Sequence, residues 1–238
     1  MIPKKSAIVT GGGTGIGRAV AEELLAIGFE VVITGRRADV LKTTAAEIGA
    51  VPLDFDVTRP EQVEAALREL PATVHVLVNN AGGNTDIGRP PAATLADLRD
   101  SWTANFEANV IGAVLLTNAL AERIADGGRI INISSIAARK GVDGYGAAKA
   151  AVETWTGQLA RELGPRGITV NAIAPGLVDE TGFFGGELPA AHRDVVLAHT
   201  PTGRLGLPAD IAAVAGFLAG DRSGQLTGQV IPVDGGAE

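Results

Sequence analysis

The stretch AIVTGGGTGIG at residues 7–17 decides the fold of this 238-residue chain. A short run rich in β-branched residues leads into five glycines within seven residues, and the turn opens directly into a helix. Glycine adopts positive φ and lets the backbone approach a phosphate closely, while N–H groups at a helix N-terminus favour negative charge. The stretch therefore predicts a site for the pyrophosphate of a dinucleotide.

This turn differs from the two commonest phosphate-binding loops. A Walker A loop needs Gly-Lys-Ser/Thr where the chain has Gly17-Arg18-Ala19, and the plain G-x-G-x-x-G register is not met. The pattern T-G-x-x-x-G-x-G between a first strand and a helix is more selective than a glycine cluster alone.

Outward from this stretch, short β-branched runs alternate with longer amphipathic stretches almost to the end of the chain. This alternation is typical of a parallel sheet covered by helices on both faces. We predict an α/β fold: a single-domain, Rossmann-type, doubly wound parallel sheet of about seven strands over residues 1–238. Strands are predicted at 7–10, 30–34, 50–54, 74–79, 129–134, 169–172 and 230–233. Helices are predicted at 16–27, 38–48, 61–69, 101–125, 146–163 and 208–218.

Residues 175–207 do not follow this alternation of strands and helices. They are rich in Gly, Pro and Thr, contain no clear strand, and exceed the length of an ordinary connection. We predict a substrate lid at 177–207, with a tolerated insertion as the alternative.

Composition argues against several classes of protein. The chain has no cysteine, which rules out disulfides, thiolate metal sites and cysteine nucleophiles. His75, His192 and His199 show no metal-binding spacing, so no metal is expected. A formal charge of −7 without a dense Lys/Arg cluster argues against nucleic acid as a partner. No apolar run reaches the ~18 residues of a membrane span and no signal-peptide pattern is present, so we expect a cytoplasmic protein without membrane association.

Tyr145 and Lys149 form a candidate acid/base pair at the start of a predicted helix. Their spacing of four residues puts both side chains on one helix face. A free tyrosine has a pKa of about 10, and a neighbouring positive charge is expected to move that pKa toward the working pH. An ordinary surface pair is the alternative, but Tyr145 is the only tyrosine in the chain.

Further motifs follow along the chain. They are Asn79-Asn80-Ala81-Gly82, Asn109, Ser134-Ser135, Tyr145-x-x-x-Lys149, Pro175-Gly176 and Val233-Asp234-Gly235-Gly236. Together with the glycine turn, they resemble the motifs of the short-chain dehydrogenase/reductase family over essentially the whole chain. The resemblance implies hydride transfer between a nicotinamide dinucleotide and a small-molecule ketone or secondary alcohol.

The resemblance also implies roles for individual residues. Tyr145 is the acid/base, Ser135 hydrogen-bonds the substrate oxygen, Lys149 also holds the nicotinamide ribose, and Asn109 helps to position a water in a proton relay. The catalytic set is Asn109, Ser135, Tyr145 and Lys149. The cofactor-binding set is Gly11, Gly13, Thr14, Gly15, Ile16, Gly17, Arg36, Arg37, Asp56, Val57, Asn80, Ala81, Gly82, Tyr145, Lys149, Pro175, Gly176 and Val178.

Cofactor choice depends on the end of the second strand, where an acidic residue would bind a ribose 2′-hydroxyl and repel a 2′-phosphate. This chain instead has Thr34-Gly35-Arg36-Arg37. Gly35 leaves room, and Arg36 offers a fork of donors to a phosphate. We predict NADP(H) in preference to NAD(H), with Arg37 as a second contact or a solvated neighbour. Asp56 is expected to frame the adenine by the same resemblance, or to act only as an N-cap or turn residue.

The chain departs from the family pattern in the loop before Tyr145. Only residues 136–144 separate Ser135 from Tyr145, whereas about a dozen residues are common in the family, so either Ser134 or Ser135 faces the substrate. We favour Ser135, the second residue after Asn132-Ile133. Thr181 is offset by about one residue from the family's usual threonine after Pro-Gly.

The substrate is expected to lie against residues 83–85, 136–142 and 177–188, which carry no charged clamp. Phe183 and Phe184 either cap an apolar group or pack the lid. The alternative function is a non-catalytic NAD(P)-binding redox sensor or scaffold. The resemblance implies a homotetramer or homodimer that pairs through the helices carrying Asn109 and Tyr145.

Overall fold

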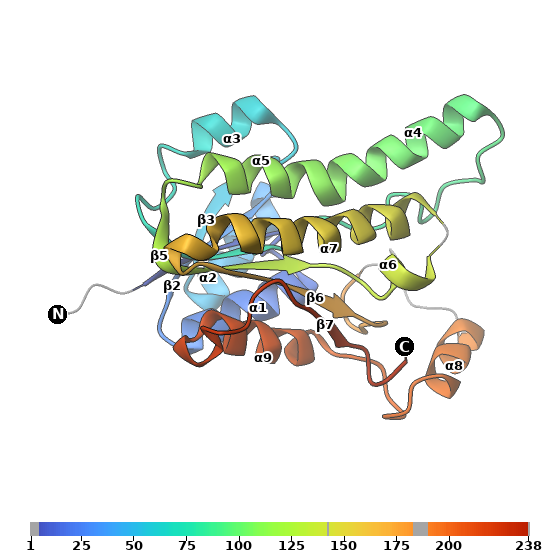
Figure 1. Cartoon of the computed structure of the whole chain (residues 1–238). Helices are drawn as coiled ribbons and strands as arrows, with labels where there is room; N and C mark the ends of the chain where they lie inside the picture. Colours follow the sequence, from blue (N-terminus) through green and yellow to red (C-terminus); the bar gives the residue numbers. More distant parts are fainter. Residues whose placement is uncertain (1–4, 142, 183–189, 238) are drawn as a thin grey trace.

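The computed structural model describes residues 5–141, 143–182 and 190–237. They form a seven-stranded sheet in the order β3-β2-β1-β4-β5-β6-β7, with every neighbouring pair parallel (Figure 1). The strands are β1 (Ser6–Thr10), β2 (Glu30–Gly35), β3 (Val51–Asp54), β4 (Val74–Asn79), β5 (Ile124–Ile133), β6 (Thr169–Pro175) and β7 (Val230–Val233). The predicted doubly wound α/β fold is confirmed.

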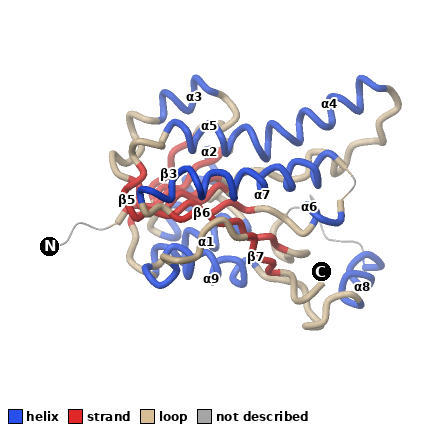
Figure 2. Tube along the Cα trace, viewed as in Figure 1, coloured by secondary structure: helices blue, strands red, loops and turns tan. Residues whose placement is uncertain are grey.

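Helices cover both faces of the sheet, as the central red layer in Figure 2 shows. The helices are α1 (Gly15–Ala26), α2 (Ala38–Ile48), α3 (Pro60–Ala66), α4 (Leu95–Phe106), α5 (Gly112–Ala119), α6 (Ala137–Lys140), α7 (Gly144–Leu163), α8 (Ala190–Ala198) and α9 (Pro208–Ala219). Apolar residues of α1, α2 and α9 pack on one face. Those of α3, α5 and α7 pack on the other.

The first strand shows why the sheet has two apolar faces. Its side chains alternate, so that Ala7 and Val9 belong to the core under α1 and α9, whereas Ile8 belongs to the core under α5 and α7. All three are fully buried. Burying a Val or Ile side chain contributes roughly 1.5–3 kcal/mol, which fixes the register of β1 between β2 and β4.

The order of the strands determines where a ligand can bind. The connection from β1 leads to β2 on one side, whereas β4 lies on the other side of β1, so the strand order reverses here. In doubly wound sheets, ligands bind in the crevice at the carboxyl ends of the strands flanking such a point. Thr10 at the end of β1 and Asn79 at the end of β4 therefore mark the expected site.

Two predicted elements were wrong in extent. The helix predicted at 101–125 begins earlier, at Leu95, because Thr94 and Asp97 form a capping box. It contains a π-helical turn, Glu107–Ile111, and ends at Ala119. The fifth strand begins at Ile124 rather than at Arg129, since Ile124 already pairs with Val74 before a register shift. A helix, α8, also forms where only irregular structure was expected.

Candidate active site

The glycine turn has the close backbone approach that its sequence predicts. Gly11 and Gly15 have φ of +65° and +52°, in the left-handed region that favours glycine. A Cβ on Gly17 would lie 2.2 Å from the carbonyl oxygen of Gly11, so the first turn of α1 can pack against the strand end only with glycine here. The N–H groups that open α1 are thereby held over the carboxyl end of β1.

A cleft of about 1080 Å³ lies beside this turn, at the carboxyl ends of the strands. It brings together every residue of the predicted cofactor-binding set and three of the four predicted catalytic residues. The lining includes Gly11, Gly13, Thr14, Gly15, Ile16, Gly17, Arg36, Arg37, Asp56, Val57, Asn80, Ala81, Gly82, Ser135, Tyr145, Lys149, Pro175, Gly176 and Val178. Asn109 does not line the cleft.

Asn80 locks the glycine turn to the segment that follows β4. Its backbone N–H and that of Ala81 both donate to the Thr10 hydroxyl, each at 2.9 Å. The Asn80 side chain donates to the carbonyl oxygens of Thr10 and Gly11, at 2.9 and 3.2 Å. These four bonds hold the two sides of the crevice at a fixed separation.

The first turns of α7 carry Tyr145 and Lys149. The Asp143 carboxylate accepts a hydrogen bond of 2.8 Å from the backbone N–H of Gly146 and so caps this helix. The Lys149 ammonium donates to the carbonyl oxygen of Ile133 at 2.8 Å and lies 5.7 Å from the Tyr145 ring centre. The predicted pair therefore exists in the fold, and its two side chains are 8% and 4% exposed.

Burial controls the pKa values of this pair. It raises the pKa of Tyr145 to about 12, against a hydrogen bond from Ser135 that lowers it, and the Asp143 charge raises it further. Burial lowers the pKa of Lys149 to about 8. The expectation that the tyrosine pKa would move toward neutrality is wrong for this structure, because loss of hydration on burial raises that pKa. Both shifts favour the uncharged forms.

The two candidate serines have different surroundings. Both serines border the cleft, but Ser135 shares a hydrogen bond with Tyr145, and its hydroxyl accepts another from the Ala137 N–H at 3.1 Å. Ser134 is 2% exposed, and its hydroxyl donates to a Glu153 carboxylate oxygen at 2.9 Å. The geometry therefore favours Ser135 as the hydroxyl available to a substrate beside Tyr145.

Asn109 supports the cleft from behind rather than lining it. It lies in the π-helical turn and is 3% exposed. Its amide donates to the carbonyl oxygens of Gly83 and Asn105, both at 2.9 Å, and its oxygen accepts from the Gly83 N–H at 3.0 Å. Asn109 thus fixes the loop after β4, and its role in a proton relay stays a prediction.

At the end of the cleft expected to hold adenosine, an acidic residue and two basic residues lie together. The Asp56 carboxylate accepts hydrogen bonds from the Thr58 backbone and hydroxyl at 2.9 and 2.8 Å, so Asp56 is a turn residue as well as a lining residue. Although burial opposes it, these bonds and the charges of Arg36 and Arg59 lower the pKa of Asp56. The Arg37 guanidinium reaches the Thr14 hydroxyl at 3.5 Å. Both arginines after β2 therefore border the cleft.

Residues of the predicted lid enter the cleft from above the glycine turn. Val178 forms a parallel bridge with Gly206, which closes the base of this segment. Glu180 has a φ of +59°, a left-handed conformation that is rare outside glycine. Thr181 then lies directly over Gly15, whose ideal Cβ position is 3.3 Å from the Thr181 Cα. Thr181 therefore lies beside the glycine turn, and its contact with the cofactor stays a prediction.

The sequence reasoning missed several lining residues. Thr34, Phe55 and Ala108 lie near motifs that were recognised, and only packing brings them into the cleft. Lys140 on α6, which belongs to the predicted substrate-contact range 136–142, does line it and donates a hydrogen bond to the Ala237 carbonyl oxygen. Of the predicted substrate contacts, Val142 and residues 183–188, which include Phe183 and Phe184, lie outside the described residues.

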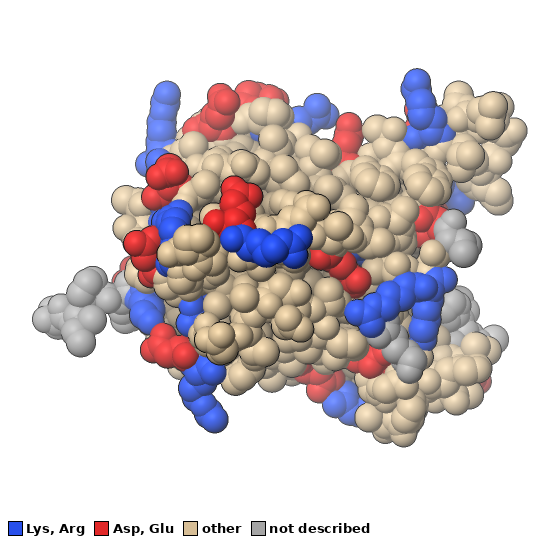
Figure 3. All heavy atoms as spheres, viewed as in Figure 1, with Lys and Arg blue, Asp and Glu red and all other residues tan. Residues whose placement is uncertain are grey.

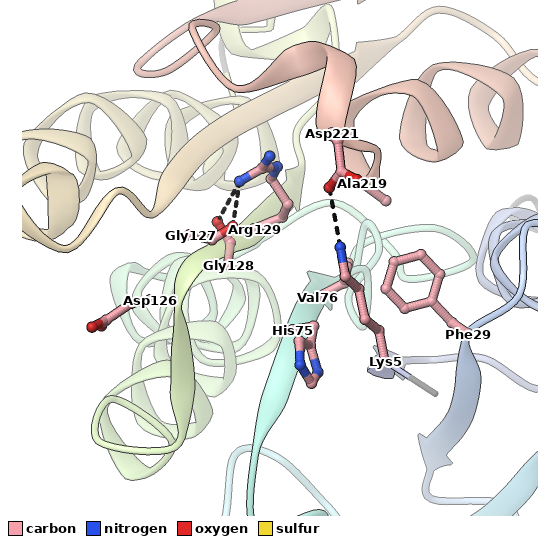
Figure 4. A pocket seen from close by; sticks show the side chains of 10 residues that line it. All are labelled: Lys5, Phe29, His75, Val76, Asp126, Gly127, Gly128, Arg129, Ala219 and Asp221. Atoms are coloured by element: carbon pink, nitrogen blue, oxygen red, sulfur yellow. Dashed lines mark hydrogen bonds and ion pairs between the residues drawn. The ribbon is translucent and has the colours of Figure 1, made fainter. Parts of the chain in front are cut away.

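A second, smaller cavity of about 80 Å³ lies at the opposite edge of the sheet (Figure 4). Lys5 there forms an ion pair of 3.0 Å with Asp221. Arg129 donates to the carbonyl oxygens of Gly127 and Gly128 at 2.5 and 3.1 Å. Asp126, which also lines this cavity, forms an ion pair of 2.9 Å with Arg166. None of the predicted site residues lies in this cavity.

Other kinds of site find no support in the described ranges. Within residues 5–141, 143–182 and 190–237, no three His, Asp or Glu side chains cluster as metal ligands. No helix in this part of the chain is long and apolar enough to cross a membrane. Acidic and basic side chains are interspersed on the face shown in Figure 3, without a dense block of one sign.

Comparison with known proteins agrees with this geometry. A family model described as enoyl-(acyl carrier protein) reductase matches residues 11–238. An Arabidopsis thaliana protein named NADPH-dependent aldehyde reductase-like protein, chloroplastic, is 38% identical over 97% of this chain and 93% of its own length. A 3-oxoacyl-(acyl-carrier-protein) reductase of Pseudomonas aeruginosa is 38% identical over 98% of this chain and 96% of its own length.

Solved structures show the same likeness. A dehydrogenase/reductase from Sinorhizobium meliloti 1021 superposes with a TM-score of 0.86 and 33% identity, covering 98% of this chain and 95% of that one. A mutant of a Serratia marcescens short-chain dehydrogenase/reductase superposes with a TM-score of 0.85 and 32% identity, covering 98% of this chain and 97% of that one.

Proposed function

This chain belongs to the short-chain dehydrogenase/reductase family, and we propose that it transfers hydride between NADP(H) and a ketone or secondary alcohol. The supporting observation is that Ser135, Tyr145 and Lys149 share one cleft with the glycine turn. A cofactor scaffold or redox sensor has no need of an acid/base pair beside a hydroxyl donor in that cleft.

The cleft fits a phosphorylated dinucleotide. At its pyrophosphate end, Gly17 lets the first turn of α1 pack against the Gly11 carbonyl, where a Cβ would clash. At its adenosine end, the Thr34 hydroxyl is buried without a hydrogen-bond partner among the described residues, and Thr34 lines the cleft. The residues from Gly11 to Gly17, together with Asn80, Arg36 and Arg37, would hold the cofactor.

When bound, the reduced nicotinamide supplies a hydride to the carbonyl carbon. Tyr145 donates its phenolic proton to the carbonyl oxygen, whose C=O π electrons form the new O–H bond, and Ser135 donates a hydrogen bond to the same oxygen. A pKa of about 12 keeps the proton on Tyr145 until that oxygen gains negative charge. The Lys149 ammonium, with a pKa of about 8, then returns a proton to the phenolate.

The preference for NADP(H) rests on Gly35, Arg36 and Arg37. Arg36 carries a positive charge beside the adenosine end, where a 2′-phosphate would form charge-assisted hydrogen bonds. One relative is named for NADPH dependence. The negative charge of Asp56 offsets part of the positive charge of Arg36. We therefore expect the protein to bind NADP(H) more tightly than NAD(H) but to bind both.

The relatives suggest two reactions to compare. Two of them are named as reductases of an aldehyde and of a 3-oxoacyl chain, and the family model is described as an enoyl reductase. A carbonyl substrate fits Tyr145 and Ser135 best, because both would donate to an oxygen. Absorbance at the nicotinamide band with NADPH and a panel of ketones, 3-oxoacyl thioesters, quinones and an enoyl thioester tests this.

Turnover of a carbonyl compound that Tyr145→Phe abolishes, with NADPH still bound, would support the proposal. Turnover of the enoyl thioester alone would replace it with reduction of a C=C bond. Tight NADPH binding without turnover of any compound would favour the sensor alternative.

We also propose a homotetramer or homodimer that pairs through α4 and α7. Trp102 on α4 is 40% exposed, and Leu95 and Leu98 beside it are 85% and 45% exposed, whereas Trp155 packs against the core. Light scattering at micromolar concentration tests the assembly, and a monomer would contradict it. The lid at 177–207 and the cytoplasmic location stay predictions, and one relative is named chloroplastic.

A further inference from the structure

Two adjacent serines follow β5, and both border the cleft, but their hydroxyls have different partners. Ser135 is half-buried and bonded to Tyr145. Ser134 is 2% exposed, and its hydroxyl donates to a carboxylate oxygen of Glu153 at 2.9 Å. The sequence left open whether Ser134 or Ser135 contacts the substrate. In the structure, the two serines differ in that Glu153 accepts the hydrogen bond of Ser134.

Glu153 lies on α7, one turn beyond Lys149 and two turns beyond Tyr145. Its side chain is only 14% exposed. A carboxylate at such a depth is costly unless hydrogen bonds and an opposite charge compensate it. Its first oxygen accepts from Ser134, and its second lies 3.9 Å from the Arg139 guanidinium. One side chain thus connects the end of β5, α6 and α7.

We propose that Glu153 is a positioning residue that holds the Ser134 hydroxyl away from the cleft and thereby keeps Ser135 directed at Tyr145. Through Arg139 it also braces α6, the short helix that fills the shortened loop before Tyr145. The inference rests on the proposed reductase function. Glu153 does not touch the cleft itself, so its effect on catalysis passes through Ser135.

The remaining acceptor for Ser134 explains why Glu153 should matter. Without the carboxylate, the other acceptor that the described part of the chain offers Ser134 is the Lys149 carbonyl oxygen at 3.4 Å, which is long for an O–H···O bond. The strand end would lose its fixed side-chain bond, and both serines would gain freedom. A displacement of about 1 Å in a catalytic group can lower a rate by about 10²-fold.

Substitutions at Glu153 can separate the hydrogen bond from the charge. Glu153→Gln keeps an oxygen acceptor for Ser134 but loses the attraction to Arg139, whereas Glu153→Leu and Glu153→Met remove both. Glu162→Gln, at an exposed position on the same helix, is the matched control for loss of a carboxylate. Two different apolar replacements allow the test to continue if one of them does not fold.

The first measurement is kcat for a carbonyl substrate together with the Kd for NADPH. We expect a loss of about 10-fold or more in kcat for Glu153→Leu, rescue to within about threefold by Glu153→Gln, and no change for Glu162→Gln. The Kd for NADPH should stay within about twofold throughout, because the cofactor contacts are untouched. An unchanged kcat in Glu153→Leu, or an equal loss in Glu153→Gln, would overturn the inference.

The second measurement needs no activity. Because the chain contains no cysteine, Ser134→Cys and Ser135→Cys each introduce a single thiol. With Glu153 intact, an aromatic disulfide reagent should label the thiol at 135 about 10-fold faster or more than the thiol at 134, since burial protects a thiol. Glu153→Leu should shrink that ratio at least about threefold.

An unchanged labelling ratio would overturn the inference whether or not the enzyme turns over a substrate. A ratio that shrinks in a protein without any turnover would support the role of Glu153 in sorting the two serines and would count against the proposed reductase function alone. The two failures are therefore distinguishable.

Discussion

The Lys149 ammonium nitrogen lies 5.7 Å from the centre of the Tyr145 ring, one helical turn along α7. Both groups are buried. Burial favours the neutral phenol of Tyr145 and lowers the pKa of the Lys149 ammonium. This combination suits a proton donor that must act only when a substrate oxygen becomes basic.

Replacing Tyr145 by Phe should abolish turnover while leaving the cleft intact. Positioned acid/base groups contribute about 10²–10⁴-fold to a rate, so kcat should fall at least about 10²-fold. Fluorescence titration with NADPH should give a Kd within about threefold of that of the unmodified enzyme, because the phenyl ring keeps its packing. Residual turnover near the original level would remove Tyr145 from the mechanism.

Stability should rise with pH between 8 and 10 because of Lys149. Its pKa is lowered to about 8 on folding from 10.5, so in this window the unfolded chain binds the extra proton and the folded chain does not. The free energy of unfolding should therefore increase, on the order of 2 kcal/mol over the window. Above pH 10 the Tyr145 phenol should have the opposite effect. Because folding raises its pKa to about 12, the unfolded chain loses this proton first, and the free energy of unfolding should fall again.

Denaturant unfolding at several pH values measures this effect. Lys149→Met is the control, since it lacks the titrating group and should show a flat profile between pH 8 and 10. A parallel rise in Lys149→Met would assign the effect to another group.

Gly17→Ala should destabilise the protein and weaken cofactor binding together. The new Cβ would meet the Gly11 carbonyl oxygen at 2.2 Å, and relieving such a clash moves backbone at a cost of roughly 1–3 kcal/mol. Gly164→Ala is the matched control, because its backbone is helical and nothing lies within 4 Å of its Cβ position. Thermal unfolding should show a lower Tm for Gly17→Ala only, and equal Tm values would refute the close approach.

Arg36→Gln should raise the Kd for NADPH much more than the Kd for NADH. A hydrogen bond to a charged group contributes about 1.5–3 kcal/mol, which corresponds to roughly 10- to 150-fold in Kd. Arg37→Gln in parallel decides whether the second arginine is a contact or a solvated neighbour. Arg222→Gln, close to Asp221 at the opposite edge, controls for the loss of one positive charge. Equal losses for both cofactors would contradict a 2′-phosphate site.

The strand order and the cofactor edge were predictable because their signals are local. A glycine turn between a strand and a helix indicates a phosphate-binding site without reference to distant residues. The positions of Asn80, Tyr145 and Lys149 follow from the predicted strand end and from helix spacing. The sheet brought all of them to one edge, as parallel strands must.

The rest depended on contacts that spacing does not encode. Which serine hydroxyl stays available beside Tyr145 depends on Glu153, which holds the Ser134 hydroxyl, lies 19 residues away from it and carries no motif. The pKa of Tyr145 is raised mainly by burial, which the spacing of Tyr145 and Lys149 in the sequence does not reveal. The π-helical turn around Asn109 was hidden because an apolar pattern alone does not show where a helix changes its pitch.

The hydrogen bond from Lys140 to the Ala237 carbonyl oxygen has a practical consequence for anyone producing the protein. Ala237 borders the cleft, whereas Lys5 lies at the opposite edge of the sheet. A purification tag or immobilising linker joined after the last residue would emerge at the mouth of the cleft and compete with whatever enters it. The same attachment before the first residue would leave the entrance open, so the N-terminal end is the one to use for assays or surface coupling.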